Sequence, residues 1–448
     1  MNISPDDQER VDAIEQALLA RWPETRIAPS TERIAALVDI LGSPQLTYPT
    51  IHIGGTNGKT TTSRMIDSLL YAHGLRTGRF TSPHLETYRE RIAINGEPID
   101  PKALIFAYND IAAYLELIDS KFEHPISFFE AVTALGFVAF AEHPVDVGVI
   151  EVGMGGQWDA TNVIDAQVSL IMPIGFDHME YLGNTLQEIA ATKAGIIKEE
   201  GFIVLAQQEP EAAKELISKA AQVGAQVVRE GIEFSLLSRA IAVGGQLIAI
   251  TGLNQNYEDI FLPLHGKHQA ANAASALVAV EAFFGDQPLD IEAVRSGFAA
   301  VTSPGRCEVV HREPTIILDA AHNPHGAKAL AQTLANEFNF DEIIAVVGIF
   351  ADKDASGILK ELEPIVDHII LTQSSSTRAM ASGDLAQLAR KIFGTDRVLE
   401  LSELEIALDR AVIDATRPLR EDTVGIIVTG SVITVGQARS YLRKKFTK

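Results

Sequence analysis

The chain has 448 residues, of which 46% are hydrophobic and 21% are charged, and its formal net charge is −22. This length predicts about two or three domains with large cores, and the acidity excludes non-specific binding to nucleic acid or to an anionic membrane surface. The single cysteine, Cys307, excludes an intramolecular disulfide and a cysteine-based metal site.

Residues 1–22 are acidic and amphipathic, and they lack the basic start and apolar block of a signal peptide. The longest apolar runs, such as "EIIAVVGIF", are too short to span a bilayer. We therefore expect a cytoplasmic protein without a membrane partner.

Short apolar runs alternate with helical patterns along most of the chain. Near-continuous apolar runs are typical of parallel strands buried on both faces, so the alternation predicts a doubly wound, mostly parallel α/β fold. The predicted strands are 50–55, 77–82, 146–153, 168–175, 202–207, 315–321, 342–350, 368–373 and 424–430, and the clearest predicted helices are 60–73, 128–142, 185–198 and 269–284.

Two segments interrupt this alternation. Residues 232–264 read as short strands around a Gly-Gly pair, which predicts an antiparallel ribbon on the edge of the first domain. The stretch "VTSPGR" at 301–306 has the composition of a linker, and β/α alternation restarts after it. We expect an N-terminal domain at 1–300 and a smaller C-terminal domain at 301–448.

The segment "GGTNGKT" at 54–60 follows a predicted strand and precedes a predicted helix. It is one residue shorter than the usual phosphate-loop pattern G-x-x-x-x-G-K-[ST]. In this context glycines allow close backbone approach to phosphates, Lys59 adds a positive charge, and Thr60 offers a hydroxyl near a metal. The alternative is a Gly-rich turn that fits a short pattern by chance.

Phosphate chemistry needs Mg²⁺ with ligands close to the loop. Ser82 and Glu151 end predicted strands, and His178 follows another. Because functional groups gather at the carboxyl ends of parallel strands, these three side chains are the predicted metal ligands. Each also has an ordinary alternative, namely a loop serine, a salt-bridged glutamate and a hydrogen-bonded surface histidine.

These motifs, together with several others in the same order, resemble folylpolyglutamate synthases, some of which are also dihydrofolate synthases, in the Mur ligase superfamily. The resemblance runs from about residue 30 to residue 435, and the shortened loop is the form that this superfamily uses. The matching segments include "GGTNGKT" (54–60), "TSPHLETYRERI" (81–92), "EVGMGGQWDATN" (151–162), "KAGIIK" (193–198), "HGKHQAANAASAL" (265–277) and "LDAAHNPHGA" (318–327).

The resemblance implies a role for each matching residue. Ser82, Glu151 and His178 match Mg²⁺ ligands, Lys59 and His178 match catalytic positions, and Lys193 matches a lysine carbamylated by CO₂ that holds a second Mg²⁺ or orients the acyl phosphate. The ATP-contacting positions are matched by Gly55, Thr56, Asn57, Gly58, Lys59, Thr60, Thr61, Gln269, Asn272, Arg306, Asp319 and His322.

The substrate side is matched less closely. His84, Arg91 and Asp159 fall where the family binds the pteroate group, and Gln157 stands where related sequences often carry Arg. Lys353 and Arg378 are the expected binders of the glutamate carboxylates, with exposed salt bridges as the alternative.

The implied activity is ATP-dependent ligation of L-glutamate to a folate through an acyl phosphate, by a monomer with a P-loop domain and a Rossmann-like C-terminal domain. Addition of glutamate to dihydropteroate is left open. The alternatives are a Mur-type ligase acting on a peptidoglycan precursor, and a nucleotide-dependent switch. The sequence has no N-K-x-D guanine motif, which argues against a GTPase switch.

Overall fold

The computed structural model describes residues 4–23, 26, 28–285, 287–416 and 423–446. The chain divides into two compact units, residues 1–240, 247–262 and 270–301 in the first, and residues 241–246, 263–269 and 302–448 in the second. Because two short segments before residue 301 belong to the second unit, a single boundary does not describe this division, and the functional domains 1–300 and 301–448 stay a prediction. Within the described ranges, no helix is long and apolar enough to cross a membrane.

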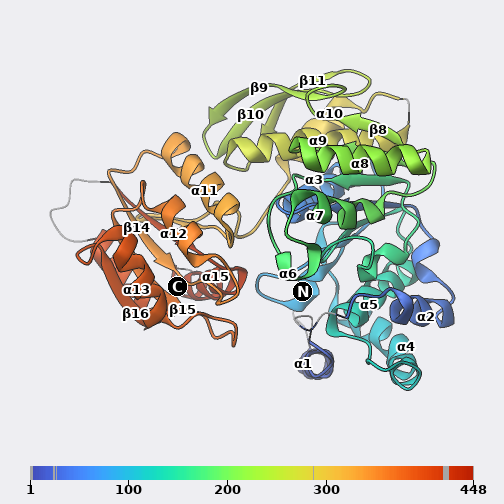
Figure 1. Ribbon diagram of the computed structural model, residues 1–448, viewed down its shortest axis with the longest axis horizontal. Helices are drawn as coiled ribbons and strands as arrows, with labels where there is room; N and C mark the ends of the chain where they lie inside the picture. The colour runs from blue at the N-terminus through green and yellow to red at the C-terminus, as the bar shows by residue number, and fades with distance from the viewer. Residues whose placement is uncertain (1–3, 24–25, 27, 286, 417–422, 447–448) are drawn as a thin grey trace. The chain divides into compact units, whose positions relative to one another are not determined.

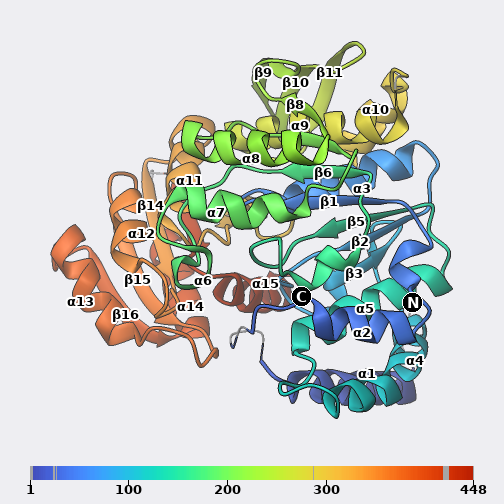
Figure 2. The ribbon, with the colours of Figure 1, turned by 45° about the vertical axis from the view of Figure 1, so that its right-hand side comes forward.

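The first unit is built on an eight-stranded sheet in the order β4-β3-β2-β5-β1-β6-β7-β8. Figure 1 labels its edge strand β8, and Figure 2 labels β1, β2, β3, β5 and β6. The six strands from β2 to β8 in this order run parallel, and β3 and β4 are antiparallel additions at one edge. This arrangement confirms the predicted fold class. The strands are β1 Thr50–Gly54, β2 Thr77–Phe80, β3 Ile92–Ile94, β4 Glu97–Pro98, β5 Val147–Glu151, β6 Val168–Ile171, β7 Phe202–Leu205 and β8 Gln226–Arg229.

Strand register brings the carboxyl ends of the central strands to one edge of this sheet. Ile53 of β1 lies opposite Glu151 of β5, and Gly54 lies opposite Ile171 of β6. All five residues of β1 are buried, as expected for a central parallel strand covered on both faces. The loops that follow β2, β5, β1, β6 and β7 therefore leave the sheet side by side.

The helices of the first unit form packed groups. One group joins α1, α2, α4 and α5, a second joins α3 and α10, and a third joins α7 and α8 (Figure 2). Their bounds are α1 Pro5–Leu19, α2 Glu32–Ile40, α3 Lys59–Ala72, α4 Pro101–Asp119, α5 Phe128–Glu142, α6 Met179–Leu182, α7 Leu186–Lys193, α8 Pro210–Val223, α9 Lys267–Phe284 and α10 Ile291–Ala299, with short 3₁₀ turns at Pro44–Leu46, Tyr88–Arg91, Ala160–Val163 and Ala194–Ile196.

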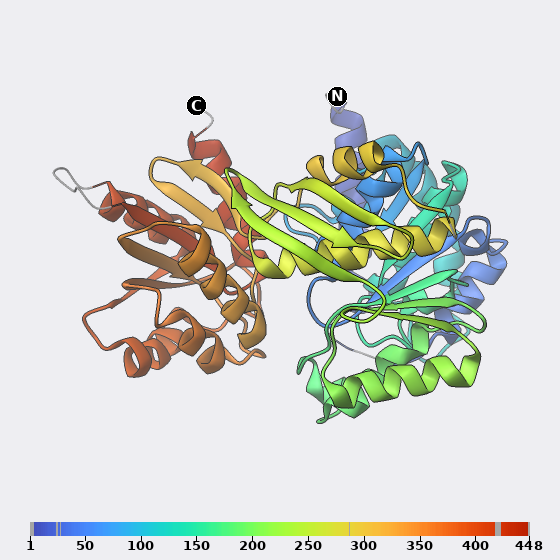
Figure 3. The same cartoon turned by 90° about the horizontal axis from the view of Figure 1, so that it is seen from above.

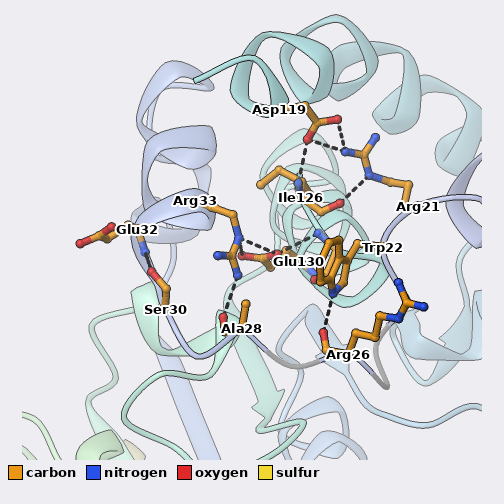
Figure 4. Close-up of polar contacts among 11 residues, drawn as sticks. Arg21, Trp22, Arg26, Ala28, Ser30, Glu32, Arg33, Asp119, Ile126 and Glu130 are labelled. Atoms are coloured by element: carbon orange, nitrogen blue, oxygen red, sulfur yellow. Dashed lines mark hydrogen bonds and ion pairs between the residues drawn. The ribbon is translucent and has the colours of Figure 1, made fainter. Parts of the chain in front are cut away.

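A buried ion pair fixes α2 to the start of α5 (Figure 4). The Nε atom of Arg33 lies 3.0 Å from Oε1 of Glu130, and both side chains are almost completely buried. Ser127 and Glu130 also form a capping box, in which each side chain accepts a hydrogen bond from the other residue's backbone. Helix α5 is buried nearly all round. The capping box therefore supplies hydrogen-bond partners to backbone groups at its first turn.

The segment predicted as an edge ribbon forms a sheet of its own (Figure 3). Its strands, in the order β11-β10-β9, do not extend the eight-stranded sheet, which ends at β8 on that side. The predicted short strands are present, and most of their residues belong to the first unit, as expected for a ribbon on the edge of the first domain. Turn signals identify such short strands but not their partners. The bounds are β9 Ser235–Ala242, β10 Gly245–Thr251 and β11 Asn256–Leu262.

The second unit contains a six-stranded sheet in the order β12-β13-β17-β14-β15-β16. All of its strands are parallel except β12 at one edge. The alternating β/α order confirms the predicted smaller α/β unit. The elements are β12 Glu308–Arg312, β13 Thr315–Leu318, α11 Pro324–Glu337, β14 Glu342–Val347, α12 Ala355–Leu362, β15 His368–Gln373, α13 Ser382–Phe393, β16 Val398–Glu403, α14 Leu404–Ala415, β17 Val424–Thr429 and α15 Val432–Phe446.

Candidate active site

The segment between β1 and α3 has the geometry of a phosphate-binding loop. Gly55 and Gly58 have φ angles of 130° and 88°, which L side chains rarely adopt. A Cβ atom on Gly55 would also lie 2.6 Å from Cβ and 2.8 Å from the backbone oxygen of Met172. Helix α3 starts directly after the loop, and the first N–H groups of a helix are available to phosphate oxygens.

Two lysine side chains converge on one carbonyl of this loop. Nζ of Lys59 lies 3.1 Å from the backbone oxygen of Gly55 and 3.1 Å from that of Thr56. Nζ of Lys193, at the end of α7, lies 2.9 Å from the same Gly55 oxygen and is buried. Burial and the positive charge of Lys59 lower the pKa of Lys193 to about 7. The lowered pKa favours the uncharged, nucleophilic amine at pH values where an ordinary lysine is protonated.

Thr60 and Glu151 form the part of the site that suits a metal ion. Oγ1 of Thr60 donates a hydrogen bond of 2.9 Å to Oε1 of Glu151, which is buried at the end of β5. Ser82 follows β2, the strand paired with β5, so it lies at the same edge of the sheet. Hydroxyl and carboxylate oxygens are the ligands that Mg²⁺ prefers, so these residues fit that ion.

The described residues contain no cluster of three or more His, Cys, Asp or Glu side chains able to hold a metal. A Mg²⁺ ion in this edge of the sheet would therefore depend on hydroxyl groups, on ligand phosphates or on water for its remaining coordination. This is the usual situation for Mg²⁺ in phosphoryl-transfer sites, since Mg²⁺ keeps several waters and binds substrate phosphates.

His178 lies farther along the connection between β6 and α6. It adopts a left-handed backbone conformation with φ 50°, and its side chain is 39% exposed. Its backbone N–H donates a hydrogen bond to the Asp177 side chain. The structure thus places His178 in a loop that leaves the sheet next to the phosphate loop, and its metal-binding role stays a prediction.

Among the other predicted nucleotide contacts, Asn272 lies against the loop. A Cβ atom on Gly58 would come within 3.0 Å of Oδ1 of Asn272, which is a buried residue of α9. Thr61 is buried in the first turn of α3. Gln269 is also buried, but it belongs to the second unit, where its backbone N–H donates to the Gly266 carbonyl.

The predicted pteroate-side residues have different surroundings. Arg91 is buried, donates from Nε to Nδ1 of His84 at 3.0 Å and stacks on the ring of Phe128. The structure therefore brings the predicted pair His84 and Arg91 together.

Asp159 is fully buried, and its carboxylate accepts hydrogen bonds from the backbone of Met154 and from both the backbone and the hydroxyl of Thr161. Burial raises the pKa of Asp159. These bonds hold the 153–159 loop in shape, and the predicted substrate role of Asp159 stays a prediction.

In the second unit, Asp319 is partly buried directly after β13 and accepts hydrogen bonds from the backbone of Cys307 and Ala321. Burial raises the pKa of Asp319, and the charge of Arg306 opposes that shift. Nδ1 of His322 lies 3.0 Å from the Ala320 oxygen. The three residues predicted near the nucleotide thus gather around the same strand end.

The predicted glutamate binders lie elsewhere in the second unit. Arg378 forms an ion pair of 2.7 Å with Asp352 and stacks on Phe350, with both charged side chains over 40% exposed. The contact of Arg378 matches the alternative of an exposed salt bridge. Lys353 adjoins this pair in sequence, and its backbone N–H donates to the Phe350 carbonyl.

Sequence patterns missed two groups that shape the site. Met172 forms the wall of the phosphate loop at Gly55, and Gln208, after β7, binds the backbone on both sides of Met172. Gln208 follows the apolar run "FIVLA" and so could have been found by the rule that identified Glu151. Met172 carries no such signal, because an apolar residue after an apolar strand is indistinguishable from core.

Comparison with known proteins identifies two matching family models. The Mur ligase middle domain matches residues 53–280, and the Mur ligase, glutamate ligase domain matches residues 305–432. The chain is 48% identical to the dihydrofolate synthase/folylpolyglutamate synthase of Mycobacterium tuberculosis, over 98% of this chain and 95% of the relative. It is 33% identical to the corresponding Bacillus subtilis protein, over 93% of this chain and 96% of that relative.

Among solved structures, the chain is similar to the Mycobacterium tuberculosis folylpolyglutamate synthase complexed with ADP and AMPPCP. The TM-score is 0.92 at 48% sequence identity, and the alignment covers 97% of this chain and 98% of the other. At this coverage, the similarity includes residues of both units.

Proposed function

The chain belongs to the family of dihydrofolate synthases and folylpolyglutamate synthases within the Mur ligases, and we propose that it joins L-glutamate to a folate. It is an ATP-dependent carboxylate–amine ligase. The observation that carries the proposal is the convergence of Lys59, Lys193 and the Thr60–Glu151 pair around one loop at the edge of a parallel sheet.

The reaction needs activation because a carboxylate repels nucleophiles and has no good leaving group. Transfer of the γ-phosphoryl group from ATP gives an acyl phosphate, whose carbonyl carbon the amine of glutamate attacks, releasing phosphate. Lys59 and the N–H groups at the start of α3 neutralise and orient the phosphates. His178 is proposed to stabilise the oxyanion that forms during the attack.

Thr60, Glu151 and Ser82, with His178 as a further ligand, are the residues that would hold Mg²⁺. When bound, the metal supplies positive charge that offsets the negative charge of the phosphates. The Thr60–Glu151 hydrogen bond supports this assignment, because it keeps two oxygen donors together beside the phosphate loop. A second Mg²⁺ is part of the same proposal.

Lys193 is proposed to react with CO₂ and to act as a carbamate. Its burial and its pKa of about 7 support the proposal, because an uncharged amine is the form that attacks CO₂. The attack forms a C–N bond, leaves an anionic carboxylate on the nitrogen and releases one proton. The product anion would be stabilised by the neighbouring Lys59.

The remaining contacts are proposals of the same kind. Asn272, Gln269, Arg306, Asp319 and His322 would contact ATP, His84 and Arg91 would contact the pteroate group, and the second unit would bind glutamate near Lys353 and Arg378. We also propose that the protein is a monomer, which light scattering of the purified protein would test. We propose a cytoplasmic location as well.

The decisive experiment measures phosphate release with ATP, L-glutamate and one acceptor at a time. A reduced folate should support release, and mass spectrometry should show one added glutamate. Dihydropteroate is the second acceptor to test, because the relatives from Mycobacterium tuberculosis and Bacillus subtilis carry both names. The proposal would be overturned in favour of a peptidoglycan ligase if phosphate were released with a muramyl-peptide acceptor but with neither the reduced folate nor dihydropteroate.

A further inference from the structure

Gln208 binds the peptide segment that follows strand β6. Its Nε2 atom donates hydrogen bonds to the backbone oxygens of Ile171 at 3.2 Å and Met172 at 3.1 Å, and its Oε1 atom accepts one from the N–H of Ile174 at 3.1 Å. One partly buried side chain thus satisfies three backbone groups within four residues. The Met172 oxygen and the Ile174 N–H lie just past the end of the buried strand β6, beyond its last paired residue. The Ile171 oxygen, in the last residue of β6, also accepts a hydrogen bond from the Ala206 N–H.

The phosphate loop binds the same segment. The backbone N–H of Thr56 donates to the oxygen of Pro173 at 3.1 Å. Its hydroxyl donates to the oxygen of Gly175 at 3.1 Å and accepts from the Gly175 N–H at 3.0 Å. Residues 171–175 are therefore held both by Gln208 and by Thr56.

The segment also shapes the loop by direct packing. The backbone and Cβ of Met172 occupy the space where a Gly55 side chain would stand, and the Met172 Cε atom lies 3.3 Å from the Cβ position of Gly58. Three residues after Gly175 the chain reaches His178. A displacement of residues 172–175 would thus disturb the phosphate loop and the start of the His178 loop together.

We propose that Gln208 is a positioning residue, which fixes the wall of the phosphate loop and the approach to His178 without touching the substrate. The inference rests on the proposed function in one respect, namely that the loop holds the phosphates of a nucleotide. A purely structural role would cost stability and leave nucleotide affinity unchanged.

Two variants and one matched control test this role. Gln208→Ala removes all three hydrogen bonds. Gln208→Glu keeps an acceptor for Ile174 and turns a carboxylate oxygen toward two carbonyl oxygens, which repel it. Gln207→Ala changes an exposed side chain one position away. Calorimetry with ADP alone gives the dissociation constant, and thermal melting reports stability.

We expect Gln208→Ala to weaken ADP binding by about tenfold, the order expected when the Met172 oxygen and the Ile174 N–H lose a hydrogen-bond partner. Gln208→Glu should weaken it further, and Gln207→Ala should bind ADP like the unmodified protein. In steady-state assays kcat should fall together with the rise in KM for ATP, since the His178 approach moves as well. If Gln208→Ala does not fold, Gln208→Met replaces it with the same expectation.

ADP affinity in Gln208→Ala and Gln208→Glu equal to that of Gln207→Ala would overturn the inference, whatever the melting temperatures. This outcome is distinct from failure of the proposed function. ADP binding requires no acceptor, so an enzyme that ligates something other than folate would still show the effect of Gln208.

Discussion

Lys59 and Lys193 donate hydrogen bonds to the same backbone oxygen, that of Gly55, at 3.1 and 2.9 Å. The two residues come from the start of α3 and the end of α7, 134 positions apart by their numbers (193 − 59). Two ammonium groups so close in a buried site repel each other, and the more buried one loses its proton more readily. This relationship links the phosphate loop to the proposed carbamate.

The pH dependence of carbamate formation follows from the lowered pKa of Lys193. The uncharged amine becomes populated as the pH rises through about 7, whereas an ordinary lysine stays charged until about pH 10. At fixed dissolved CO₂, the carbamate signal in ¹³C NMR with labelled CO₂ should therefore grow between pH 6 and pH 8. Lys193→Ala should lack that signal and should lose most of the ligase activity.

The exposed Lys214 on α8 provides the control for this measurement. Lys214→Ala should keep both the signal and the activity. Full activity of Lys193→Ala would contradict the proposed role of the carbamate. A ¹³C carbamate signal that appears only above about pH 9 would contradict the lowered pKa of Lys193.

Lys59→Ala should abolish ADP formation while leaving the fold intact. Lys59 is partly exposed and donates hydrogen bonds to the Gly55 and Thr56 carbonyls of its own loop, so its loss removes charge without opening the core. We expect the rate of ADP release to fall by at least about a hundredfold, as for other groups that neutralise phosphates during transfer. Coupled-enzyme detection of ADP, with circular dichroism as a check on folding, measures this. Near-normal release would show that the loop does not serve phosphoryl transfer.

Two neighbouring glycines should respond differently to alanine. In Gly55→Ala, the new methyl group would meet Met172 at 2.6 Å in a backbone conformation unfavourable for alanine. In Gly175→Ala, the methyl group would meet no atom within 4 Å. We expect ADP affinity to fall by at least about tenfold in Gly55→Ala and to stay unchanged in Gly175→Ala. Equal ADP affinities of Gly55→Ala and Gly175→Ala would mean that the phosphate loop accommodates the added methyl group at Gly55.

The sequence was sufficient to predict the parallel sheets, because buried strands at the centre of a sheet have a strong apolar pattern. It also placed Glu151 and Ser82 at or just after the ends of two paired strands, while their metal-binding role stays a prediction. It could not predict that Lys59 and Lys193 share an acceptor, since this depends on how the end of α7 packs against the loop after β1. The sequence predicted the strands β9–β11 but not the order in which they pair, because the partners of a short strand are chosen by tertiary packing.

The ion pair between Arg33 and Glu130 should contribute to stability rather than to catalysis (Figure 4). Removing one partner of a buried pair leaves the other charge without compensation, and this typically costs about 3–5 kcal/mol. Arg33→Met keeps the apolar stem and should lower the free energy of unfolding by about 3 kcal/mol. Glu32→Ala, on the exposed face of the same helix, should change it by less than about 0.5 kcal/mol. Urea titration followed by circular dichroism compares the two, and equal midpoints would contradict the assignment.

The Thr60–Glu151 contact predicts how the enzyme depends on Mg²⁺. Thr60→Ser keeps the hydroxyl that donates to Glu151 and should behave like the unmodified protein, whereas Thr60→Val removes it with little change in size. Glu151→Gln removes the negative charge that attracts the cation. Because both changes weaken an oxygen donor set without touching the nucleotide base, half-maximal activity should need at least about tenfold more Mg²⁺ in Thr60→Val and Glu151→Gln. Activity measured against free Mg²⁺ at saturating ATP separates this effect from weaker ATP binding. If high Mg²⁺ restored the activity of neither variant, Thr60 and Glu151 would act in the chemical step by a means other than Mg²⁺ binding. If both variants kept the normal Mg²⁺ requirement, the metal would bind elsewhere.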